Sequence, residues 1–154
     1  MEDLLVRDIM TTDLISIDRH LKVAQALELM HAEGVRRLPV VVPGDRLVGI
    51  ITEKDARLAL PRVAEAGGLG GYDGLSYEGL HASEPPSVQD VMSHYVHTLT
   101  PNRSVAHAAE LLAAHRISGL PVVEEGRLVG IVTAYDIYRL VADALVRPRV
   151  RTAA

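Results

Sequence analysis

The chain has 154 residues, a net charge of −4 and no cysteine, so a disulfide framework, a thiolate nucleophile and a cysteine-based zinc site are excluded. Acidic and basic residues are interspersed except at Arg147, Arg149 and Arg151, and Phe and Trp are absent, which argues against binding to duplex or single-stranded nucleic acid. Without a leader-like start or an apolar run of about 18 residues, the sequence predicts a cytoplasmic protein with no membrane contact.

The chain contains two copies of one sequence unit. Residues 6–44 and 46–60 align with residues 88–126 and 127–141, with 21 identities in 54 aligned positions. The offset falls from 82 to 81 residues at Asp45, which has no counterpart. Two copies of a unit that cannot bury its own apolar face tend to pair about a pseudo-twofold axis, and a ligand groove is expected between them.

Each copy is predicted to form a strand, a helix, two further strands and a final helix. In the first copy residues 14–17 form a short extended run, and Val23, Leu27 and Met30 recur at helical spacing until Gly34. Apolar runs at 38–42 and 47–51 flank a Pro-Gly-Asp turn and predict a β-hairpin covered by helices. The second copy repeats this order with a strand at 96–99, a helix at 105–115 and a hairpin at 120–123 and 128–132.

The predicted organisation is a first unit at 1–65, a linker at 66–87, a second unit at 88–146 and a basic tail at 147–154. The linker is rich in glycine and proline and has no apolar period, which is typical of a flexible connection. Its tyrosines and leucines leave open the alternative that it forms a lid over a groove.

Both copies place a threonine and an aspartate where the last hairpin strand leads into the final helix. These residues are Thr52 and Asp55 in the first copy and Thr133 and Asp136 in the second. A threonine followed three residues later by an acidic residue is typical of a helix N-cap and needs no ligand. The same geometry suits a ligand, because a carboxylate accepts hydrogen bonds from both ribose hydroxyls and a helix N-terminus attracts phosphate.

The histidines and serines do not predict catalysis or metal binding. His94 and His97 are three residues apart, but no acidic residue stands beside them at ligand spacing. Ser118 precedes Gly119 without the sequence signature of a catalytic serine. We therefore expect no catalytic residue and no metal ligand.

Three strings in each copy make the chain resemble a tandem pair of CBS (cystathionine beta-synthase) domains, also called a Bateman module. They are Val-Arg-Asp-Ile-Met or Val-Gln-Asp-Val-Met, then Leu-Pro-Val-Val, then Leu-Val-Gly-Ile followed by an aliphatic residue and Thr-x-x-Asp, and together they cover residues 6 to about 142. The resemblance implies an α/β fold with two pseudo-symmetric β-α-β-β-α units packed sheet to sheet and helices outside. It also implies two clefts that bind adenosine-containing ligands such as AMP, ADP, ATP, S-adenosylmethionine or NAD.

The resemblance also assigns residues to the clefts. Each cleft would combine the Thr-x-x-Asp of one copy with the first strand and pre-hairpin residues of the other. Cleft one would contain Thr52, Asp55, His97, Ile117, Ser118 and Gly119, with Lys54 and Arg116 as the available positive charges, and cleft two would contain Thr133, Asp136, Ile15, Val35, Arg36 and Arg37. Because arginine suits phosphate oxygens, cleft two is expected to take a phosphorylated nucleotide, although both arginines could instead cover a strand edge in solvent.

The function implied is that of a stand-alone regulatory sensor and not an enzyme, with an adenine nucleotide as regulatory ligand and an unknown effector protein addressed in trans. A homodimer is expected to form through the helix faces Val23/Leu27/Met30 and Ala108/Leu111/Leu112. Two alternatives are a ligand-free dimerisation module and an enzyme acting on nucleotides.

Overall fold

The computed structural model describes residues 4–60 and 84–146, and the predicted linker and basic tail lie largely outside this part of the chain. The first repeat contains α1 (Val6–Ile9), β1 (Ile17–Asp18), α2 (Val23–Glu33), β2 (Arg37–Val42), β3 (Arg46–Thr52) and α3 (Glu53–Ala59). The second contains α4 (Val88–Val91), α5 (Val105–His115), β4 (Gly119–Glu124), β5 (Arg127–Thr133) and α6 (Ala134–Val146). Each repeat therefore begins with a short helix that the sequence analysis did not predict.

The predicted order of elements is confirmed in the first repeat, but the strand predicted at 96–99 is wrong. Leu99 forms only an isolated parallel bridge with Val122. In this bridge the Leu99 amide donates to the Pro121 carbonyl, and the Leu99 carbonyl accepts from the Val123 amide. The next donor in such a parallel ladder would be residue 101, which is proline and has no N–H. The pairing therefore stops after one residue.

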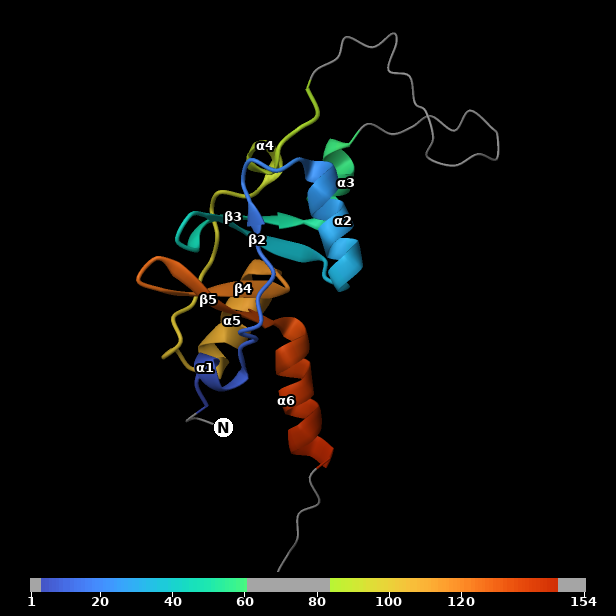
Figure 1. Cartoon of the computed structure of the whole chain (residues 1–154). Coiled ribbons are helices and arrows are strands. Elements are labelled where there is room, and N and C mark those ends of the chain that lie inside the picture. The colour runs from blue at the N-terminus through green and yellow to red at the C-terminus, as the bar shows by residue number, and fades with distance from the viewer. Residues whose placement is uncertain (1–3, 61–83, 147–154) are drawn as a thin grey trace, which may run out of the picture.

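The α/β fold class is confirmed, with both hairpins in one five-stranded sheet of order β1-β2-β3-β5-β4. β1 runs parallel to β2, and the other neighbours are antiparallel. Figure 1 shows the two hairpins one above the other. The two units were expected to pack sheet to sheet. In the structure β3 and β5 pair at Arg46 and Arg127, beside the hairpin turns, and this pair joins the two hairpins into one sheet.

Repeat-equivalent residues meet at two places where the hairpins approach each other. Arg46 pairs with its equivalent Arg127, and the side chain of Arg37 lies against its equivalent Gly119. Equivalent residues contact each other only where a twofold axis passes between them. The two repeats are therefore related by a pseudo-twofold axis, as expected.

The repeats exchange the segments with which they begin, residues 5–11 and 87–93, which we call the lead segments. Thr11 exchanges two backbone hydrogen bonds with Ile131, and Ser93 exchanges two with Ile50. Val6 is buried in the core of the second hairpin and its helices, whereas Val88 and Met92 are buried in the core of the first. We call the first hairpin with its helices the first unit, and the second hairpin with its helices the second unit. Each unit is completed by the lead segment of the other repeat.

Four of the six residues in the apolar helix faces that were expected to form a dimer are buried inside the units, so the prediction is wrong for these four, whereas Leu27 and Leu111 are half-buried. Val23 and Met30 are buried in the first core, and Ala108 and Leu112 in the second. Among the described residues, no helix combines the length and the apolar character needed to cross a membrane.

Candidate functional site

The two Thr-x-x-Asp motifs form the predicted caps at the starts of α3 and α6. The Thr52 hydroxyl accepts from the Asp55 amide at 3.2 Å and donates to Asp55 Oδ2 at 2.5 Å. In the second unit both the amide and the hydroxyl of Thr133 donate to Asp136 Oδ2, at 2.7 and 2.8 Å. Each aspartate is half-buried and fixed by its threonine.

The same cap geometry occurs at the lead segments, where no ligand was predicted. The Leu5 amide donates to Asp8 Oδ2, and both the amide and hydroxyl of Ser87 donate to Asp90 Oδ2. The hydrogen bond from the Ser87 hydroxyl, and after it the bond from the Ser87 amide, holds the pKa of the Asp90 carboxyl below its usual range. A capped aspartate is therefore a structural feature of this chain, and a ligand role for Asp55 or Asp136 needs support from their surroundings.

Each threonine lies beside the pre-hairpin residues of its own unit. The strand register places Arg37 opposite Thr52 and Gly119 opposite Thr133. At the next step, the Glu53 amide donates to the Arg36 carbonyl and the Ala134 amide donates to the Ser118 carbonyl. Helix start and pre-hairpin segment are thereby fixed together in each unit.

Arg37 connects the two units. Its guanidinium donates to the Ser118 hydroxyl across the pseudo-twofold axis. A Cβ at Gly119 would lie 2.9 Å from Arg37 Cδ, so the side chain needs a glycine beneath it. Burial, and then the charge of Arg36, lowers the pKa of this half-buried guanidinium. Both Arg37 and Ser118 were predicted from the sequence to be site residues, but their contact was not predicted.

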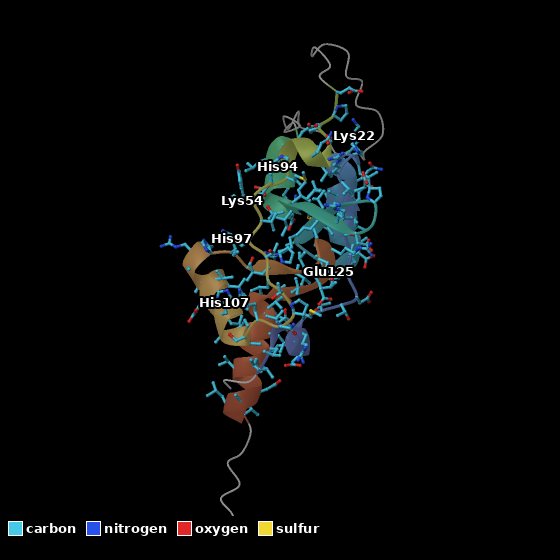
Figure 2. The ribbon with its side chains drawn as sticks, turned by 90° about the vertical axis from the view of Figure 1, so that its left-hand side faces the viewer. Lys22, Lys54, His94, His97, His107 and Glu125 are labelled. Carbon is cyan, nitrogen blue, oxygen red and sulfur yellow. The ribbon has the colours of Figure 1, made fainter. Side chains whose placement is uncertain are left out.

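Other predicted site residues lie around these junctions. Lys54, Arg116 and Ser118 are exposed. The ring of His97 stacks on that of His115, at 3.7 Å between centroids and 23° between planes, and Figure 2 shows His97 and Lys54 on the same side of the molecule. Ile15 and Val35 pack against the first core and Ile117 against the second. The division of these residues between two clefts stays a prediction.

Each unit also has a groove between the helix before its hairpin and the helix after it, which was not predicted from the sequence. The first groove, of about 640 Å³, lies between α2 and α3 and includes Arg36 together with an ion pair in which Arg57 binds Glu53 Oε1 at 2.7 Å. That bond is the main cause that lowers the pKa of Glu53. The only sequence signal for this ion pair was the spacing of four residues between Glu53 and Arg57. The second groove, between α5 and α6, is about 150 Å³ and lined by apolar residues and Tyr138.

Comparison with known proteins gives matches along nearly the whole chain. A family model for the CBS domain matches residues 6–62 and 88–143. A CBS domain-containing protein of Dictyostelium discoideum is 33% identical, with 92% of this chain and 93% of that protein covered. The CBS domain-containing protein YhcV of Bacillus subtilis is 33% identical over 86% of this chain and 81% of its own length. A homoserine O-acetyltransferase of Methanosphaerula palustris is 30% identical, but this chain spans only 25% of it.

Solved structures show the same fold. The CBS domain pair of protein MJ0100, in complex with 5-methylthioadenosine and S-adenosylmethionine, has a TM-score of 0.72 and 28% identity, with 91% of this chain and 97% of that chain covered. CBSX2 in complex with AMP has a TM-score of 0.74, with 92% and 98% covered. Its identity is 24%, so this second likeness concerns the fold alone.

Proposed function

The chain belongs to the CBS domain family, and from this premise we propose that it is a regulatory module that binds an adenosine-containing ligand between its two units. It acts in the cytoplasm as a homodimer and signals to a separate effector protein. We propose no catalytic role, because the matching enzymes are longer proteins of which this chain spans a small part.

The observation that carries this proposal is the convergence of both strand-to-helix junctions on the pseudo-twofold axis. Strand register holds Thr52 beside Arg37 and Thr133 beside Gly119, and Arg37 then reaches Ser118 of the other unit. A ligand bound there would contact both units, so its binding free energy would depend on how they are placed. This is the property that a regulatory module needs.

Adenosine is the recognition element we propose, because each capped aspartate keeps a second oxygen for it. Both capping interactions use Oδ2, and no hydrogen bond among the described residues uses Oδ1 of Asp55 or Asp136. A fixed carboxylate oxygen can accept from ribose hydroxyls. Arg36 and Arg37 favour AMP, ADP or ATP over S-adenosylmethionine or NAD, since arginine binds phosphate oxygens through charged hydrogen bonds.

A thermal shift series with AMP, ADP, ATP, S-adenosylmethionine, NAD and adenosine tests the proposal. A ligand that prefers the folded protein raises the melting temperature, by an amount that grows with its concentration above Kd. We expect the largest rise for a phosphorylated adenosine. No rise for any of the six at millimolar concentration would contradict the proposal.

A ligand-free dimerisation module is the second candidate function. It is favoured by the four capped aspartates, because Asp8 and Asp90 share the geometry of Asp55 and Asp136 without a proposed ligand. Equilibrium dialysis separates the two functions: a dimer that retains no adenosine compound would support this second candidate.

A further inference from the structure

The two repeats differ in the pair of residues at which their hairpins begin. The first repeat has Arg36 and Arg37, whereas the second has Ser118 and Gly119 at the equivalent positions. These positions face each other across the pseudo-twofold axis, where the side chain of Arg37 lies against Gly119. The second repeat therefore leaves room at the axis that a long side chain of the first repeat occupies.

Ser118 and Gly119 hold the side chain of Arg37 from two directions, and we call them the Arg37 support. The hydroxyl of Ser118 accepts a hydrogen bond from the guanidinium. A Cβ at Gly119 would lie 2.9 Å from Arg37 Cδ, 3.1 Å from Nη1 and 3.3 Å from Nε, so a larger residue there would displace the arginine. Ordering a long side chain costs conformational entropy, and a side chain that is already ordered does not add this cost when a ligand binds.

The charge of Arg37 has no acidic partner within residues 4–60 and 84–146. In this part of the chain the only ion pair joins Arg57 to Glu53. Burial, and then the charge of Arg36, lowers the pKa of Arg37, and neither cause is a carboxylate. A half-buried charge without a partner is unfavourable, so an anionic ligand would stabilise this guanidinium. The bond to Ser118 uses only Nη2, which leaves the other N–H groups available for such a ligand.

Ser118 also fixes the helix start that carries the aspartate of the other recognition element. Its carbonyl accepts from the amide of Ala134, the first residue of α6. Thr133, which precedes this residue, donates from its amide and its hydroxyl to Asp136. Ser118 thus connects the guanidinium of Arg37 with the junction that positions Asp136. In a nucleotide the ribose and the 5′-phosphate are joined by a single methylene group, so the protein groups that bind them must keep a fixed separation.

We propose that Ser118 and Gly119 are positioning residues that hold Arg37 for the 5′-phosphate of a nucleotide whose ribose binds Asp136. This inference rests on the adenosine site proposed above and assigns its preference for phosphate to a contact between the two repeats. The resemblance placed Ser118 and Gly119 in cleft one as ligand contacts, but here they act on cleft two through Arg37. The second repeat, without an arginine at these positions, contributes to phosphate recognition through an arginine of the first.

Ser118→Ala tests the hydroxyl of the Arg37 support. Arg37 stays present but is no longer ordered, so AMP should bind roughly 2- to 10-fold more weakly, the scale of ordering one long side chain. The affinity for adenosine should not change. Ser118→Thr keeps a hydroxyl and should bind AMP as the wild type does. Ser93→Ala is the matched control, because Ser93 is exposed and its hydroxyl makes no hydrogen bond to the residues that the structure describes.

Calorimetry with AMP and adenosine measures both affinities for each variant. An AMP affinity in Ser118→Ala equal to that of the wild type would overturn the proposal. Equal losses in Ser118→Ala and Ser118→Thr would overturn it as well, because the hydroxyl would then not be the group that matters.

Gly119→Ala tests whether the glycine acts through Arg37. The added Cβ would displace the arginine, so AMP affinity should fall by at least about tenfold, the scale of one lost charged hydrogen bond, while adenosine affinity stays unchanged. In an Arg37→Ala background the same substitution should change AMP affinity by less than about twofold. Circular dichroism checks that each variant is folded.

A loss of AMP affinity that persists without Arg37, or equal losses for AMP and adenosine, would overturn the proposal. A wild-type protein that binds AMP and adenosine equally would overturn this inference alone. A wild-type protein that binds neither compound would overturn the proposed function as well.

Discussion

Replacing Gly49 or Gly130 by alanine tests the exchange of the lead segments. An added Cβ at Gly130 would lie 2.5 Å from Met10 Sδ, and its three nearest atoms all belong to the Met10 side chain. An added Cβ at Gly49 would lie 2.5 Å from Met92 Sδ and also 2.9 Å from the backbone carbonyl oxygen of Ser93. Methionine can adopt another rotamer, but the Ser93 backbone is held by two hydrogen bonds to Ile50.

These distances predict unequal losses at two equivalent positions. Overpacking a core costs about 1–3 kcal/mol, and replacing glycine by alanine within a strand returns roughly 0.5–1 kcal/mol of backbone entropy. We expect Gly49→Ala to lower the free energy of unfolding by about 1–2 kcal/mol and Gly130→Ala to change it by less than about 1 kcal/mol.

Urea unfolding of both variants measures the difference, and Met10→Ala provides the control. Because Met10 is the side chain that an alanine at position 130 would touch, Gly130→Ala should cost less in the Met10→Ala background than in the wild type. Its cost should be unaffected by Met92→Ala. Equal losses for the two glycines, or coupling of Gly130 to Met92 and not to Met10, would refute the exchange.

Three other variants test the ligand site and the caps. Asp136→Asn should weaken nucleotide binding by roughly 10-fold or more while changing the unfolding free energy by under about 1 kcal/mol, and Asp55→Asn is the control in the other unit. Calorimetry measures the binding and urea unfolding measures the stability. Unchanged binding with a large loss of stability would mean that the aspartate is only a cap. Replacing Arg36 and Arg37 by alanine should weaken AMP binding by roughly 1.5–3 kcal/mol per lost charged hydrogen bond and leave the affinity for adenosine nearly unchanged. Calorimetry measures both affinities. Equal losses for the two ligands would mean that the arginines do not bind phosphate. Asp90, whose pKa is lowered in the folded protein, should stabilise it above the pKa of the unfolded chain, and this contribution should disappear as pH falls through the folded pKa. Asp90→Asn should therefore flatten the pH dependence of stability measured in urea, and an unchanged slope would contradict this assignment.

The two Thr-x-x-Asp caps of the candidate site could be predicted from sequence because they depend on local geometry. A threonine followed by an aspartate three residues later makes a cap with bonds that span only those residues, and Thr52, Asp55, Thr133 and Asp136 make them. Contacts between the units could not be located in this way. Arg37 was expected to face phosphate or solvent, but its bond to Ser118 joins residues 81 positions apart.

The prediction of the dimer surface failed for a related reason. Helical spacing correctly indicated that Val23 and Met30 share an apolar face, but periodicity does not indicate what covers that face. In the structure the face is covered by the unit's own sheet and by the other repeat's lead segment, which places Val88 in the same core.

The sequence by itself determined the two repeats, the hairpins, the starts of α3 and α6 and the caps that Thr52 and Thr133 form there with Asp55 and Asp136. Each of these depends on residues that are close in the chain, where backbone preference and side-chain reach decide the conformation. Only the tertiary structure decided which unit each lead segment completes, how Arg37 crosses the pseudo-twofold axis and that the groove of the first unit is larger than that of the second. These features depend on packing between residues far apart in the chain, and two repeats with the same order of elements offer similar local signals for either arrangement.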